Sequence, residues 1–117
     1  MICDQWHVVV VPFPFSDMPG AKNRPALVLS AKTFNRAGHS VLAMITTSVH
    51  RAWPGDSVVS DRRAAGLRAA CIVRLKLFTL DNRLILRSLG RLGRLDREAV
   101  VASLRQHVPY PAALRSA

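Results

Sequence analysis

Four consecutive valines, Val8 to Val11, stand near the start of the chain and are followed by Pro12 and Pro14. Branching at Cβ restricts the χ1 angle, so such a run is poor helix material and suits a buried strand. The pattern predicts a strand over residues 7–15 that closes at the prolines. A cluster of turn residues follows at 16–20. A buried β-strand is therefore expected near the start of the chain.

Further short apolar segments alternate with turn residues along the chain. They predict strands over residues 26–30, 41–47, 57–59, 71–78 and 84–89. Short helices are expected over 32–37 and from a cap at Asp61 to Gly66, and one long helix from a cap at Asp96 to about His107. Short strands with a terminal helix indicate a mainly β fold, a small curled sheet or barrel. We expect a single domain over 1–117, with its core at about 6–108 and a loose tail at 109–117.

The net charge of the chain indicates which classes of binding partner it favours. Lys and Arg number 17 against 7 Asp and Glu, a formal net charge of +10. Such an excess makes the domain repel itself, and this repulsion is better tolerated when the partner is a polyanion. Surface charge kept for solubility is the alternative. The excess is large for this length and favours a nucleic-acid or acidic-protein partner.

The sequence gives little support for a metal site, a disulfide framework or a membrane segment. The two cysteines, Cys3 and Cys71, do not form the Cys-x-x-Cys spacing of zinc sites. No metal and no cofactor are therefore expected. The longest uncharged apolar stretch, residues 6–15, is too short to span a bilayer. With no signal-peptide pattern at the amino terminus, we expect a cytoplasmic protein without a membrane segment.

Several sequence fragments occur in a characteristic order. They read VPFPFSD at 11–17, KNRPALVLS at 22–30, ITT at 45–47, TLD at 79–81 and LGRL at 89–92. In this order and spacing they resemble the MazF/PemK family of toxin endoribonucleases, over roughly residues 6–108. The resemblance implies an SH3-like barrel of the MazF/PemK/CcdB type with a C-terminal helix, and a homodimer.

The same resemblance implies a function and partners. Family membership implies the toxin of a type II toxin–antitoxin system, a sequence-specific, metal-independent endoribonuclease that cuts single-stranded RNA, mRNA above all, and so inhibits translation. It also implies a cognate acidic antitoxin whose flexible tail occupies the RNA groove, with DNA contacted only through that antitoxin. The key arginine of the family corresponds to Arg24 and its key threonine to Thr46. An aromatic–proline pair over the RNA corresponds to Trp53 and Pro54.

The side chains are consistent with this chemistry. RNA can be cut without metal because its own 2′-hydroxyl attacks the neighbouring phosphorus, which leaves the enzyme to move protons and stabilise charge. A guanidinium at Arg24, expected in a loop, matches phosphate geometry, and Thr46 offers one hydroxyl donor. Neither residue ionises like a general base near neutral pH, so the base is unassigned, with His50 as a candidate.

The remaining candidates for RNA binding are Lys22, Thr47, Trp53, Arg74 and Lys76. Alternation along 71–78 places Arg74 and Lys76 on one strand face, with Val73, Leu75 and Leu77 on the other. Either cation could instead belong to a solvated face, and Trp53 could be a lid on the core.

Two other functions stay open. A CcdB-type inhibitor has the same barrel, binds a protein target and cuts nothing, but needs neither Arg24 nor Thr46. A relative that binds RNA with weakened catalysis is the second, because His7 and Lys76 depart from residues that many or several family members carry.

Overall fold

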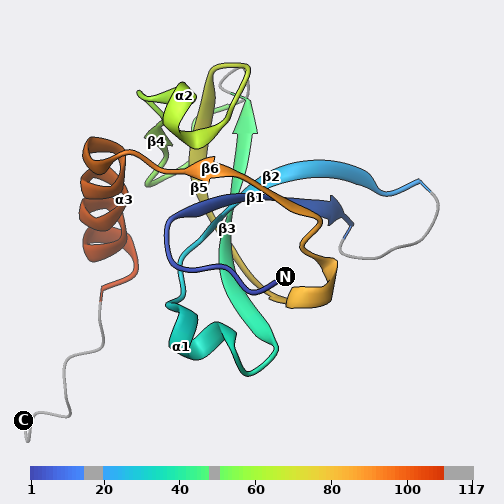
Figure 1. Cartoon of the computed structure of the whole chain (residues 1–117). Coiled ribbons are helices and arrows are strands. Elements are labelled where there is room, and N and C mark those ends of the chain that lie inside the picture. Colours follow the sequence, from blue (N-terminus) through green and yellow to red (C-terminus); the bar gives the residue numbers. More distant parts are fainter. Residues whose placement is uncertain (15–19, 48–50, 110–117) are drawn as a thin grey trace, which may run out of the picture.

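The computed structural model describes residues 1–14, 20–47 and 51–109, which hold six strands, three α-helices and one 3-10 helix. The strands are β1 (His7–Phe13), β2 (Lys22–Val28), β3 (His39–Thr47), β4 (Ser57–Val58), β5 (Cys71–Asp81) and β6 (Arg87–Arg91). The helices are α1 (Lys32–Asn35), α2 (Arg62–Ala65), η1 (Asn82–Leu84) and α3 (Arg94–His107). The predicted mainly β fold with a C-terminal helix is confirmed (Figure 1).

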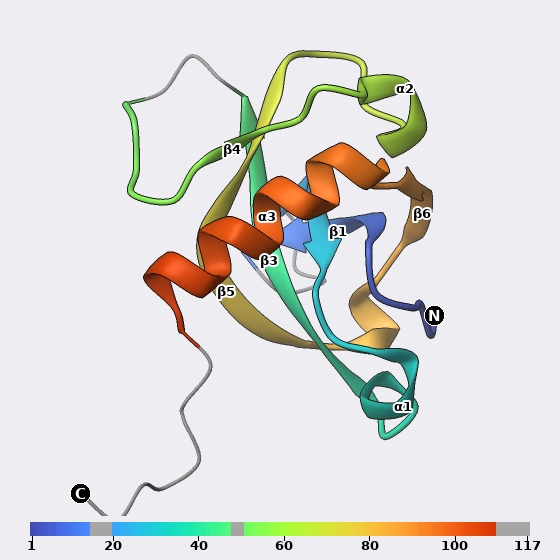
Figure 2. The ribbon, with the colours of Figure 1, turned by 90° about the vertical axis from the view of Figure 1, so that its left-hand side faces the viewer.

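The strands form one curled antiparallel sheet, an open half-barrel, in the order β4-β5-β3-β2-β1-β6. The valine strand β1 lies inside the sheet, between β2 and β6. Helix α3 lies across one face of the sheet, in front of β3 and β5 in Figure 2. None of the helices in the described ranges is long and apolar enough to cross a membrane.

Two hydrophobic cores lie on opposite faces of this sheet. Val8 and Leu27 belong to the first core, which α3 covers with Val100. Val9, Ala26 and Leu42 belong to the second core, on the other face. Because successive strand residues point to opposite faces, a strand buried on both sides needs an unbroken apolar run. This explains the four valines.

The second strand begins earlier than the sequence predicted, at residue 22 and not at 26. Arg24, expected in a loop, is therefore a strand residue that pairs with Val11 of β1. The reason is the length of its partner: β1 continues to Phe13, which pairs with Lys22. Pairing between the two strands thus carries Arg24 into the sheet.

The start of the last strand was also predicted wrongly. It was expected at residue 84, but residues 82–84 form η1 and β6 begins at Arg87. The carboxylate of Asp81 accepts a hydrogen bond of 2.9 Å from the backbone N–H of Arg83. That bond caps η1 and turns the chain before it can enter the sheet.

Helix α3 does not begin with Asp96 as its cap. It begins at Arg94, and Gly93 occupies the cap position. Asp96 lies inside the first turn, is buried, and accepts hydrogen bonds of 2.9 Å from the backbone N–H groups of Ser60 and Asp61. A negative side chain near a helix N-terminus is favourable there, and this one also ties α3 to the chain before α2.

Candidate functional site

One face of the sheet changes from apolar to polar along its strands. On β2, Ala26 is buried in the second core, and Arg24 lies two residues earlier on the same face. On β3, Leu42 is buried in that core, and Thr46 lies four residues later on the same face. Phe13 ends β1 and is 40% exposed. The period of two therefore brings an arginine, a threonine and an aromatic ring to one end of this face.

These side chains surround a hollow with a volume of about 170 Å³, named here the Arg24 hollow. Its walls are formed by Phe13, Arg24, Met44, Ile45, Thr46, Arg74 and Lys76. Four candidates from the sequence, Arg24, Thr46, Arg74 and Lys76, thus meet in one place although they come from three strands. Cationic groups surround one hydroxyl there, beside apolar walls.

A β-bulge in β5 shapes one wall of the Arg24 hollow. Ala43 pairs with Leu77, but the next residue, Met44, pairs with Arg74, so two residues of β5 have no partner in β3. Such bulges bend a strand and redirect its side chains. Arg74 and Lys76 both line the hollow, and Leu77, which the sequence placed on the opposite strand face, is 40% exposed.

Arg24 packs on an aromatic ring within the hollow. Its guanidinium carbon lies 5.6 Å from the centre of the Phe13 ring. At this distance the positive charge is attracted to the face of the ring. Ion pairs among the described residues involve Arg74 and Arg83 and do not include Arg24. Arg24 is exposed, and its charge faces the hollow.

Arg74, in contrast, is engaged by an acid. Its Nε and Nη2 atoms donate hydrogen bonds to the two carboxylate oxygens of Asp56, at 3.1 and 2.9 Å. Burial alone would raise the pKa of Asp56, but the hydrogen bond and charge of Arg74, with the backbone N–H of Trp53, lower it below its ordinary value. The pair therefore stays ionised at neutral pH.

Trp53 lies against both cations of β5. Its ring centre is 5.5 Å from the guanidinium carbon of Arg74 and 5.3 Å from Nζ of Lys76. The residue is 41% exposed, so it is not the core lid that the sequence left open. It stands beside the Arg24 hollow, over one wall.

The other candidates from the sequence are placed less centrally. Lys22 lies opposite Phe13 on β2 and is exposed, outside the lining of the hollow. Thr47 pairs with Cys71 and is also outside that lining. His50 falls outside the described residues. Sequence reasoning missed Phe13, which continues the alternation of β1, and Asp56, whose partner lies 18 residues away.

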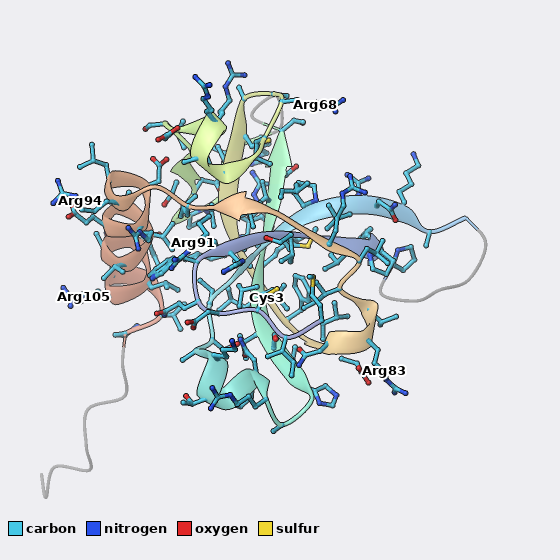
Figure 3. The ribbon with its side chains drawn as sticks, in the orientation of Figure 1. Cys3, Arg68, Arg83, Arg91, Arg94 and Arg105 are labelled. Atoms are coloured by element: carbon cyan, nitrogen blue, oxygen red, sulfur yellow. The ribbon has the colours of Figure 1, made fainter. Side chains whose placement is uncertain are left out.

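Positive charge is spread over the molecule beyond the Arg24 hollow. Arg68, Arg83 and Arg94 project from separate parts of the surface, and Arg105 lies on the same helix as Arg94 (Figure 3). The charge of +10 is thus not gathered into one patch. In the ranges that the structure describes, no three His, Cys, Asp or Glu side chains come together as a metal site would require.

A comparison with protein-family models identifies the same family that the sequence fragments resemble. The family model for "PemK-like, MazF-like toxin of type II toxin-antitoxin system" matches residues 4–108. No curated protein matches the sequence.

Solved structures share the fold. A MazE-MazF complex (form III) from Deinococcus radiodurans aligns with a TM-score of 0.73 and 21% identity, over 92% of this chain and 97% of that chain. A mycobacterial endoribonuclease in complex with its cognate antitoxin aligns with a TM-score of 0.72 and 16% identity, over 95% and 99%. The Mycobacterium tuberculosis toxin MazF-mt6 aligns with a TM-score of 0.67 and 20% identity, over 86% and 93%.

Proposed function

Because the chain belongs to the PemK-like, MazF-like toxins of type II toxin–antitoxin systems, we propose that it is a metal-independent endoribonuclease that cuts single-stranded RNA. The observation that carries this proposal is the Arg24 hollow, where Arg24, Thr46 and Lys76 surround a space beside apolar walls. Cations and a hydroxyl donor suit a phosphate, and the apolar walls suit a ribose or base beside it.

The reaction needs only groups of the RNA and of this chain. The 2′-hydroxyl oxygen attacks the adjacent phosphorus, and the bond from phosphorus to the 5′-oxygen breaks. The products are a 2′,3′-cyclic phosphate and a free 5′-hydroxyl. Arg24 donates hydrogen bonds to the phosphorane oxygens and a proton to the leaving 5′-oxygen, and Thr46 donates a further hydrogen bond.

No residue is yet assigned as the general base of this reaction. None of the seven residues that line the Arg24 hollow is an ordinary base near neutral pH. His50, four residues after Thr46 in the sequence, remains the candidate. Its imidazole would accept the proton of the 2′-hydroxyl.

Unpaired RNA suits the site better than a duplex. Trp53 and Phe13 are exposed aromatic residues at its edge, and bases of a single strand are free to stack on such rings. Lys22 and Thr47, at the adjoining strand ends, would meet neighbouring nucleotides. Sequence preference would follow from these contacts and not from the phosphate contacts.

A cognate acidic antitoxin is the proposed protein partner. Two of the similar structures are complexes of a toxin with its antitoxin. A net charge of +10 favours an acidic partner, and such a segment would compete with RNA for the same cations. We also propose a homodimer that acts in the cytoplasm and reaches DNA only through the antitoxin.

A cleavage assay with matched substrates tests the proposal. The purified chain should cut a long single-stranded RNA and leave the same sequence intact when it is annealed to its complement. The CcdB-type alternative, an inhibitor that binds a protein target, predicts no cleavage of either. Cleavage of duplex and single strand at equal rates would contradict the proposed recognition of unpaired bases.

A further inference from the structure

We propose that Asp56 is a positioning residue that keeps the charge of Arg74 away from bound RNA and fixes the Trp53 ring beside the Arg24 hollow. This inference rests on the proposed function, since it concerns how the RNA strand is held. Its consequence is that affinity at this wall depends on stacking on Trp53 and on Lys76, and little on Arg74.

The contact between Asp56 and Arg74 occupies most of the guanidinium. Nε and Nη2 both donate to the carboxylate, and Nη2 also donates to the backbone carbonyl of Arg51 at 2.9 Å. The side chains are mostly buried, 12% exposed for Arg74 and 16% for Asp56. A paired and largely buried cation contributes little to the attraction of a phosphate, because the acid cancels most of its field. Arg74 therefore differs from Lys76, which is exposed.

The same carboxylate holds the turn that carries Trp53, residues 53–56, named here the Trp53 turn. The backbone N–H of Trp53 donates to Oδ2 of Asp56 at 2.9 Å. In return the backbone N–H of Asp56 donates to the carbonyl of Trp53 at 3.1 Å. These two bonds close the turn, so the ring position depends on the acid that binds Arg74.

A second hydrogen bond, from helix α3, also fixes the Trp53 turn. Gly55 lies inside it with φ of 83°, and Ser103 of α3 donates a hydrogen bond of 2.6 Å to the Gly55 carbonyl. A Cβ at Gly55 would lie 2.6 Å from the Leu75 side chain and 2.9 Å from the Ser103 hydroxyl. The Trp53 turn is thus held between α3 and Arg74, and Asp56 is its charged link to the site.

Replacing Asp56 should have two opposite effects on RNA binding. Asp56→Asn removes the negative charge and leaves one carbonyl oxygen, so Arg74 becomes available to a phosphate while the Trp53 ring loses part of its support. Each phosphate contact on a single strand changes the slope of log affinity against log salt by about −0.7. Stacking on an aromatic ring does not depend on salt in this way.

The experiment measures this slope with a non-cleavable probe, a single-stranded RNA with a 2′-deoxy residue at the cut site. Compared with the unchanged chain, Asp56→Asn should make the slope steeper by about 0.7. At about 1 M salt, where screening suppresses the charge contribution, its affinity should be lower by roughly fivefold or more. Plots of log affinity against log salt for the two proteins should differ in slope and converge toward low salt. A destabilised fold would instead lower affinity in parallel at every salt concentration.

Two further variants isolate the cause. Asp61→Asn makes the same charge change at the cap of α2, where Asn also caps well, and should leave the slope unchanged. Arg74→Gln should barely change the slope in the unchanged chain, but should return it to the original value in the Asp56→Asn background. A parallel line for Asp56→Asn, or an equal effect of Arg74→Gln in both backgrounds, would overturn the proposal.

A measurement without RNA separates this inference from the proposed function. In a Trp6→Phe background the remaining tryptophan is Trp53, and Asp56→Asn should increase the quenching of its fluorescence by acrylamide. If quenching increases but neither protein binds RNA, Asp56 does fix the Trp53 ring and the proposed endoribonuclease function is contradicted. If quenching is unchanged, Asp56 does not fix the Trp53 ring, whether or not the protein binds RNA.

Discussion

Arg24 and Phe13 lie on neighbouring strands with the guanidinium carbon 5.6 Å from the ring centre. Arg24 pairs directly with Val11, so Phe13 is its diagonal neighbour across the ladder. The ring gives the arginine an apolar support on one side, and the guanidinium borders the hollow. The contact with Phe13 thus orients the Arg24 guanidinium, which we propose stabilises the transition state.

Replacing Arg24 should therefore affect cleavage far more than folding. Arg24→Ala removes a transition-state donor, and loss of one such donor costs about 3 kcal/mol, roughly a hundredfold in rate. The exposed side chain contributes little to stability, so the thermal midpoint should change little. Single-turnover cleavage rates measure the effect. Arg87→Ala, an exposed arginine of β6, is the control and should cleave normally. Near-normal cleavage by folded Arg24→Ala would place the site elsewhere.

Thr46→Val tests the hydroxyl donor with a side chain of the same shape. We expect the rate at saturating RNA to fall by about tenfold or more, because a hydrogen bond to developing charge is lost. The matched control is Thr79→Val, at an exposed position of β5 outside the hollow. Equal rates for the two variants would remove Thr46 from the mechanism.

Lys76 should account for one phosphate contact. With Arg74 neutralised, Lys22, Arg24 and Lys76 predict a slope of log affinity against log salt near about −2. Lys76→Ala should make that slope shallower by about 0.7 and weaken binding of all sequences alike. Arg105→Ala removes a charge from α3, on the side of the molecule away from the β1–β2 tip (Figure 3), and should leave the slope unchanged. The opposite pattern would put the RNA on the α3 face.

Stability should fall in acid partly through Asp81. Hydrogen bonds from the side chain and backbone of Arg83 lower its pKa to about 2. An unfolded Asp titrates near about 3.9, so this contribution is complete above about pH 4 and is lost as the pH falls toward 2. Thermal melts of Asp81→Asn should show a weaker dependence on pH in this window than melts of the unchanged chain. Identical profiles would contradict the assignment.

The strand pattern of the fold could be predicted because it depends on local residue choice. The valine run, the cap at Asp61 and the left-handed Gly66 all act within a few residues of themselves. Strand ends could not be predicted in the same way. Arg24 enters β2 only because β1 supplies partners up to Phe13, and pairing between strands is not visible in one segment.

The candidate site, too, could be predicted only in part. Arg24 and Thr46 were found by resemblance, and the structure places them in one hollow. The bulge in β5 depends on its register with β3, and the pair of Asp56 with Arg74 depends on how a turn folds back on a strand. Contacts of this kind join residues that are far apart in sequence, so the periodicity of one segment does not predict them.

The most direct measurement follows one RNA and its singly modified copy in excess EDTA. The purified chain should cut the unmodified single strand and leave a 2′,3′-cyclic phosphate and a 5′-hydroxyl. The copy with a 2′-deoxy residue at the cut site should stay intact. Cleavage of the deoxy copy would contradict attack by the 2′-hydroxyl. Cleavage that stops in EDTA and returns with magnesium would contradict a mechanism built from Arg24 and Thr46.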